Sequence, residues 1–101
     1  MYDMKQVGKL PKLGGKAPAA FEAFKAFDEA ALADGAIPKK YKELIALAVA
    51  MTTQCPYCLE IHKGAAKAAG ATEEEMSETA FVAAALRAGA AVVHGLHLMD
   101  D

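Results

Sequence analysis

The sequence predicts an all-α protein of about five helices that assembles as a homo-oligomer. Apolar residues recur at the spacing of helix turns, and Pro, Gly and Thr stand where helices begin and end. Ala, the strongest helix former, makes up 24 of the 101 residues. Each Ala buries little area, and a lone domain of this length covers only a limited fraction of its surface. We therefore expect further helix contacts with other subunits.

The first fifteen residues carry Gly8, Pro11, Gly14 and Gly15 and show no sustained period. Such a segment is predicted to be an irregular N-terminal arm. Residues 16–101 are then expected to form one helical domain.

Two helices are predicted between residues 18 and 53. Pro18 suits a first helical turn, and the helix after it should end near Gly35. Its apolar stripe recurs at i, i+4, i+7 and i+11: Ala20, Phe24, Phe27 and Ala31. The next helix opens at Pro38, and Glu43 is a lone acid beside its apolar face. That face consists of Tyr41, Leu44, Ile45, Leu47, Ala48 and Met51.

A third helix is predicted to begin with Cys55 at its N-cap and Pro56 at its first position. Gly70 fits the C-terminal cap of this helix. Thr72 and Glu75 then have the spacing of a capping box, which marks the start of a fourth helix.

The fourth helix is apolar nearly all round. Between residues 81 and 93 its only charged residue is Arg87, and the surface of a monomer does not sustain so apolar a helix. We expect this stretch to be buried between subunits, in a hexamer or alternatively a trimer. Gly89 and Gly95 are expected to divide it from a short last helix ending near Met99.

Charge and the N-terminal residues indicate a soluble, cytoplasmic protein. Eleven basic and thirteen acidic residues give a net charge of −2, and no basic run could follow a phosphate backbone, so we expect no nucleic acid partner. The N-terminal residues lack the apolar stretch of a signal peptide, and no charge-free apolar run of about 18 residues predicts a membrane span.

The two cysteines of the chain are Cys55 and Cys58. Closing so short a loop constrains the unfolded chain by only about 2 kcal/mol, so a structural disulfide explains the pair poorly. In a reducing compartment a Cys-X-X-Cys pair indicates redox or metal chemistry.

Cys55, Cys58 and His62 fall at i, i+3 and i+7, on one helix face. A helix N-terminus stabilises a thiolate, the reactive form of cysteine. His62 lies about one turn from Cys58 and two turns from Cys55, so proton transfer is more direct from Cys58. The spacing supplies a nucleophile, a base and a resolving thiol.

Two alternatives accompany this interpretation. The three side chains could be packing residues of a structural oligomer, or they could form a metal-binding or redox-sensing module with an open fourth position. Against a metal, all three ligands lie within about two turns of one helix and no second pair has a zinc-site spacing. His94 and His97 suit helix-end capping better than a metal pair. We expect neither a metal nor a cofactor.

The stretch from residue 42 to residue 86 resembles the carboxymuconolactone decarboxylase and alkyl hydroperoxide reductase D (AhpD-like) superfamily. The resemblance rests on Glu43–Ala50, Cys55–His62 and Ala69–Glu75, and above all on the pattern of Glu, eleven residues, Cys-X-X-Cys, three residues and His. It implies an AhpD-like helical core and a thiol-dependent peroxidase or disulfide oxidoreductase with an antioxidant role.

The resemblance also implies roles for four residues. Glu43 and His62 would form a proton relay, Cys58 would attack peroxide, and Cys55 would resolve the sulfenic acid as a disulfide. The partners would be a hydroperoxide and a thiol or disulfide electron donor. The decarboxylase branch lacks the cysteine pair, which argues against lactone decarboxylation. Hydroperoxidase D has His where this chain has Tyr57, so an identical activity and reductant are not implied.

Overall fold

The computed structural model describes residues 3–100, and every regular element in this part of the chain is helical. The α-helices are α1 (Leu10–Lys16), α2 (Pro18–Leu32), α3 (Lys39–Thr53), α4 (Pro56–Ala68) and α5 (Glu73–His94). Short 3-10 helices, η1 (Met4–Lys9) and η2 (Gly95–Met99), stand at the two ends. The predicted all-α class is confirmed.

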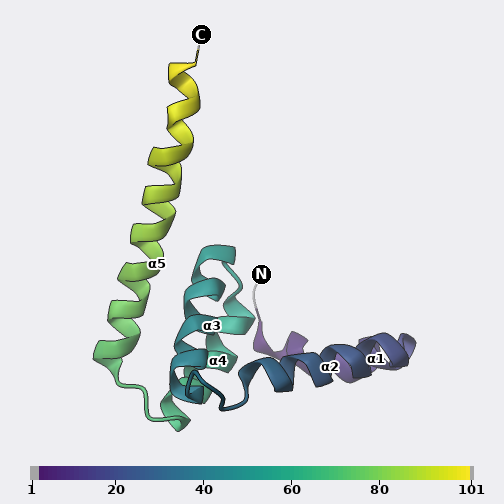
Figure 1. Cartoon of the computed structure of the whole chain (residues 1–101). Coiled ribbons are helices and arrows are strands. Elements are labelled where there is room, and N and C mark those ends of the chain that lie inside the picture. Colours follow the sequence, from purple (N-terminus) through teal and green to yellow (C-terminus); the bar gives the residue numbers. More distant parts are fainter. Residues whose placement is uncertain (1–2, 101) are drawn as a thin grey trace.

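Helices α3, α4 and α5 form the core, with α3 packed against both of the others (Figure 1). Leu44 and Leu47 of α3 are buried together with Ala66 of α4. Apolar side chains packed around them come from all three helices and the α4–α5 loop: Met51, Leu59, Ala71 and Met76. This small core holds α3 and α4 side by side, which positions the side chains described below.

The predicted signals around α4 are confirmed. Cys55 is the N-cap of α4, and Pro56 is the first helical residue, where the missing N–H has no intrahelical partner to lose. After α4 the backbone of Gly70 has φ of 96°, a conformation that favours glycine. Thr72 and Glu75 form both hydrogen bonds of a capping box at the start of α5.

The prediction of an irregular arm over residues 1–15 is wrong for the part the structure describes, since η1 and α1 cover it. Pro11 stands in the first turn of α1, where proline is tolerated. Gly14 is buried against the ring of Phe21 in α2, and a Cβ on Gly14 would overlap that ring. Gly14, one of the residues that predicted an irregular arm, thus lies where α1 and α2 pack together.

Helices α1 and α2 extend away from the core (Figure 1). α2 ends at Leu32, one turn before the expected Gly35. Its predicted apolar stripe lies in solvent in the single chain, where Phe24 is 60% and Phe27 71% exposed.

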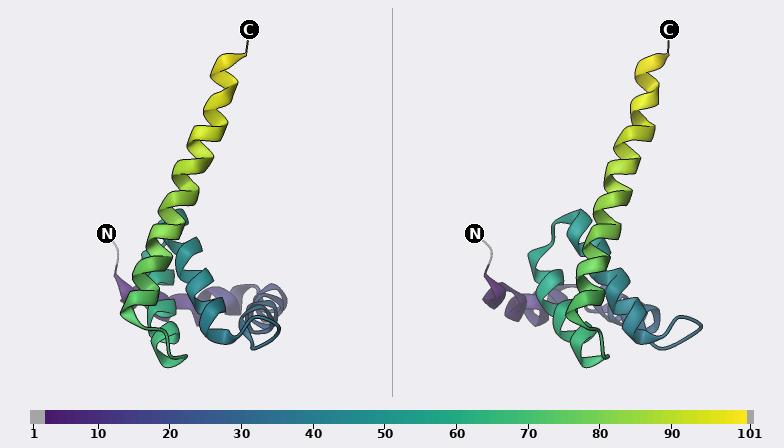
Figure 2. Two further views of the ribbon diagram at one scale, coloured as in Figure 1. Left: turned by 60° about the vertical axis from the view of Figure 1, so that its left-hand side comes forward. Right: turned by 90° about the vertical axis from the view of Figure 1, so that its left-hand side faces the viewer.

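Helix α5 projects beyond the core in a different direction, crosswise to α1 and α2, and its C-terminal end lies well away from the core (Figure 2). The expected division at Gly89 is wrong, because one glycine lowers helix stability by only about 1 kcal/mol and α5 runs through it. At Gly95 the α-helix gives way to η2, as expected. The large apolar residues of this projection are exposed: Phe81, Val82, Leu86, Val92, Val93, Leu96, Leu98 and Met99.

Within residues 3–100, one helical segment, Glu73–Met99, is long and apolar enough to cross a membrane by length and composition. Helices buried between subunits pass the same test. Arg87 lies near the middle of this segment. Length and composition alone therefore do not assign the segment to a membrane.

Candidate functional site

The cysteine pair stands at the start of α4. Cys55 is the N-cap, and its Sγ accepts a hydrogen bond from the backbone N–H of Cys58 at 3.3 Å. Both cysteines are free thiols and both are half-buried. A sulfur at this position meets the unpaired N–H groups of the first helical turn, which stabilise negative charge.

The two thiols differ in acidity. The pKa of Cys55 is lowered, mainly because the Cys58 side chain donates its S–H to the Cys55 sulfur, and also because backbone N–H groups of Cys58 and Tyr57 point at it. The pKa of Cys58 is raised by that same S–H donation, by burial and by the neighbouring charge of Cys55. In the resting dithiol, Cys55 is therefore the sulfur that ionises first.

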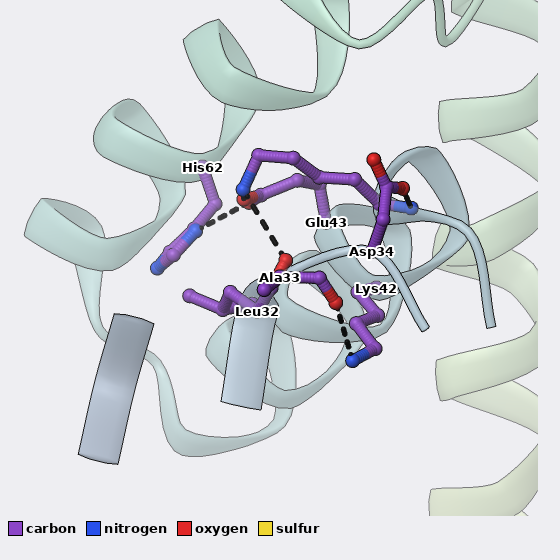
Figure 3. A network of polar contacts seen from close by, with 7 residues as sticks. Leu32, Ala33, Asp34, Lys42, Glu43 and His62 are labelled. Atoms are coloured by element: carbon purple, nitrogen blue, oxygen red, sulfur yellow. Dashed lines mark hydrogen bonds and ion pairs between the residues drawn. The ribbon is translucent and has the colours of Figure 1, made fainter. Parts of the chain in front are cut away.

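Glu43 is the one fully buried charged side chain in the part of the chain that the structure describes, with 2% of its surface exposed. It lies in the second turn of α3 and faces α4, where its Oε2 is 2.7 Å from Nδ1 of His62 (Figure 3). The expected contact between Glu43 and His62 is therefore present. An ionised carboxylate can only accept, so Nδ1 carries the hydrogen and Nε2, which points away from Glu43, is left as the acceptor.

A lysine occupies the other oxygen of Glu43. Nζ of Lys39 lies 3.2 Å from Oε1 and 3.3 Å from the carbonyl oxygen of Leu32, at the end of α2. Two further contacts hold the same junction, since Lys42 donates to the carbonyl of Ala33 at 2.6 Å and Asp34 accepts from the backbone N–H of Lys39 at 2.6 Å. These contacts tie the end of α2 to the start of α3 (Figure 3).

The site thus consists of two pairs, one at the start of α4 and one that joins the next part of α4 to α3. Cys55 with Cys58 is one pair, and His62 with Glu43 is the other. Within residues 3–100 no hydrogen bond joins His62 to either sulfur, so a proton passing between the pairs needs a bridging water, a substrate atom or a side-chain rotation.

Metal-ligating side chains do not converge in the described residues, where no group of three or more His, Cys, Asp and Glu side chains is placed to hold an ion. His94 and His97 lie edge to face at 5.1 Å between ring centres, and His97 faces Asp100 at 3.5 Å in solvent. They take no part in the site on α4.

A groove of about 490 Å³ runs between α3, α4 and α5. Its wall includes Leu59, which follows Cys58 in the chain, and two methionines, Met51 and Met76. Charged residues also line it: Glu60, Lys63 and Glu73.

Lys39 is the site residue that sequence reasoning did not single out. A signal for it exists in the sequence, because residues four apart on a helix are neighbours and Lys39 is four residues before Glu43. The sequence does not show that Glu43 is buried, so the Lys39–Glu43 spacing looks the same as that of an ion pair on a helix surface.

Among the comparisons with known proteins, a family model and a solved structure name the same family. The model of the carboxymuconolactone decarboxylase family matches residues 18–101. Uncharacterized protein 4 of the cox locus of Paracoccus denitrificans is 51% identical over 83 residues, which are 79% of this chain and 75% of that protein. An uncharacterized protein of Cupriavidus necator is 41% identical over 66 residues, 65% of this chain and 58% of that protein.

Two solved structures share the fold. A carboxymuconolactone decarboxylase family protein from Legionella pneumophila, solved in its apo form, superposes with a TM-score of 0.76 at 36% identity, over 81% of this chain and 73% of that one. A protein from Methanobacterium thermoautotrophicum gives a TM-score of 0.82 at 33% identity, over 89% of this chain and 98% of that one.

Proposed function

The chain belongs to the carboxymuconolactone decarboxylase family, and on that premise we propose that it is an antioxidant thiol oxidoreductase that reduces hydroperoxides with Cys55 and Cys58. The observation that carries the proposal is the contact between the buried Glu43 of α3 and the half-buried His62 of α4, the helix that begins with the two thiols. A buried carboxylate that orients an imidazole is the arrangement by which proteins support a base.

The proposed reaction consumes two thiols for each hydroperoxide. A cysteine thiolate attacks the outer peroxide oxygen, the O–O bond breaks, and the alcohol leaves with a proton while the sulfur becomes a sulfenic acid. The second thiolate then displaces water from that sulfur and the disulfide forms. A dithiol electron donor reduces the disulfide by exchange and returns both protons.

In this scheme Cys58 attacks the peroxide and Cys55 resolves the sulfenic acid. The position of His62 supports this order, because His62 is four residues (about one helical turn) from Cys58 and seven residues (about two turns) from Cys55. The lowered pKa of Cys55 suits a resolving thiol, which also reacts as the thiolate. Taken alone, however, the two pKa directions favour Cys55 as the attacking sulfur, so the order needs its own test.

The test of the function follows the thiols after one equivalent of cumene hydroperoxide is added to reduced protein. We expect both thiols to disappear and the intact mass to fall by two hydrogens, as an internal disulfide requires. Protein that keeps both thiols would refute the proposed activity.

The order of attack is read from two variants treated with peroxide and dimedone. Cys55→Ser should trap a sulfenic acid on Cys58, whereas Cys58→Ser should consume peroxide slowly. A dimedone label on Cys55 in a fast-reacting Cys58→Ser protein would reverse the assignment.

A further inference from the structure

The first turn of α3 has an unusual charge. It contains Lys39, Lys40 and Lys42 and no acidic residue, although the N-terminus of a helix favours negative side chains. Each lysine has a different partner: Lys39 pairs with Glu43, Lys40 with Glu75 at 2.9 Å, and Lys42 with the carbonyl of Ala33. The presence of three lysines at this helix N-terminus is therefore explained by their partners, because the helix dipole itself does not favour positive charge there.

Glu43 needs a cation more than the other acids do. With 2% of its surface exposed, its carboxylate has little access to water, and a buried carboxylate that lacks compensation takes up a proton. The Lys39 ammonium is bonded to Oε1, while His62 occupies Oε2. Among the residues that the structure describes, these two groups are the cationic or potentially cationic neighbours of the carboxylate.

The state of Glu43 determines which nitrogen of His62 is available. When Glu43 is ionised, Nδ1 carries the hydrogen and Nε2 accepts. When Glu43 is protonated, its O–H donates to Nδ1, and the neutral ring must carry its hydrogen on Nε2, which then cannot take a proton from a thiol.

We propose that Lys39 is a positioning residue of the relay, which holds Glu43 as a carboxylate and thereby keeps Nε2 of His62 free to accept a proton. The proposal deepens the proposed function and depends on it for its effect on catalysis. Lys39 touches neither thiol, and it acts through Glu43. Its second bond, to the carbonyl of Leu32, places the end of α2 against the same ammonium.

The chain offers a matched control in Lys42. Its Nζ also joins α3 to the last carbonyls of α2, through Ala33, but makes no contact with Glu43. Lys42→Met removes one tie between α2 and α3, just as Lys39→Met does, and leaves the carboxylate with its cation. Lys39→Arg keeps the charge.

The direct test reads the tautomer of His62 by ¹⁵N NMR of the imidazole nitrogens in reduced protein near pH 7.5. The chain has three histidines, so a His94→Gln, His97→Gln background leaves the His62 signals alone. We expect the hydrogen on Nδ1 in this background, in Lys42→Met and in Lys39→Arg. In Lys39→Met it should move to Nε2. Retention of the Nδ1–H pattern in Lys39→Met would overturn the proposal.

A kinetic arm connects the tautomer to catalysis. Lys39→Met should lower the rate of thiol loss with hydroperoxide roughly tenfold or more, up to the approximately 10²- to 10⁴-fold that a positioned base contributes. The same change should have no further effect in a Glu43→Gln background. An additional loss in that background would mean that Lys39 acts by another route. If the parent protein were inert to hydroperoxide, the proposed function would fail, and the tautomer comparison would still decide the role of Lys39.

Discussion

At the scale of single residues, the acidity of Cys55 is the property that the geometry determines most directly. Its thiolate is stabilised by the S–H of Cys58 and by two backbone N–H groups. Because the pKa of Cys55 is lowered and that of Cys58 is raised, iodoacetamide at pH 7 should alkylate Cys55 first. The midpoint of the alkylation rate against pH should lie below the ordinary pKa of a cysteine thiol.

The variant that isolates this effect is Cys58→Ala. Without the S–H donor, the pKa of Cys55 rises and its alkylation at pH 7 slows several-fold, because a smaller fraction is thiolate. Peptide mapping of the alkylated protein identifies the labelled residue. First labelling at Cys58 in the parent protein would contradict the stated direction of both shifts.

The cysteines and His62 could be located from sequence because their relation is local to one helix. Glu43 could not be paired with His62 from spacing alone, since 19 residues and a helix reversal separate them. The prediction that these two residues pair came from the family resemblance. The physical cause of their contact is the packing of α3 against α4. Lys39 was missed because its importance follows from the burial of Glu43, which a sequence does not display.

At the scale of elements, the capping box at the start of α5 fixes where the long helix begins. Thr72 Oγ1 accepts from the backbone N–H of Glu75 at 3.1 Å, and the Glu75 side chain accepts from the backbone N–H of Thr72 at 2.9 Å. Thr72→Ala should lower the free energy of unfolding by about 1 kcal/mol, the usual cost of losing an N-cap side chain.

A second threonine of α5 provides the control for this substitution. The hydroxyl of Thr79 bonds to the carbonyl of Glu75 inside the helix, where the backbone bond already satisfies that carbonyl. Thr79→Ala should therefore be close to neutral in urea unfolding. Equal losses from both variants would show that the cap is not what stabilises the start of α5.

Helix ends proved more predictable than the N-terminal segment. Caps depend on residues within three or four positions, so Cys55, Gly70 and Thr72 could be interpreted from the sequence. In α1, Gly14 packs against Phe21 of α2, a tertiary contact that a rule treating glycine as a helix breaker cannot detect. Gly89 was expected to end a helix, but one glycine does not stop a long helix and α5 continues through it.

At the scale of the whole molecule, the single chain exposes more surface than a compact monomer would. Its accessible area is 7660 Å², against roughly 5,500 Å² for a monomer of this mass. Its radius of gyration is 16.9 Å, against about 12.7 Å for a compact domain of this length. The excess area is comparable to that of an obligate interface. We propose that the exposed apolar faces of α2 and α5 pack against other copies in a homo-oligomer, with a hexamer favoured over a trimer.

This assembly is tested by sedimentation velocity at micromolar concentration. We expect no stable monomer, and we expect Val93→Glu, which places a charge on the projecting end of α5, to shift the protein toward smaller species. Glu29→Gln on α2 is the control and should leave the assembly unchanged. A parent protein that sediments as a stable, folded monomer would rule the assembly out.

The central claim is that the buried Glu43, through its contact with His62, serves the thiols at the start of α4. The measurement that tests it most directly is the second-order rate constant for thiol loss when reduced protein meets a hydroperoxide, compared between Glu43→Gln and Glu75→Gln. Both changes remove an acid that is paired with a lysine, but only Glu43 contacts His62. Glu43→Gln should lower the rate constant on the order of 10²-fold, and Glu75→Gln should leave it unchanged. A folded Glu43→Gln protein that reacts as fast as the parent would contradict the claim.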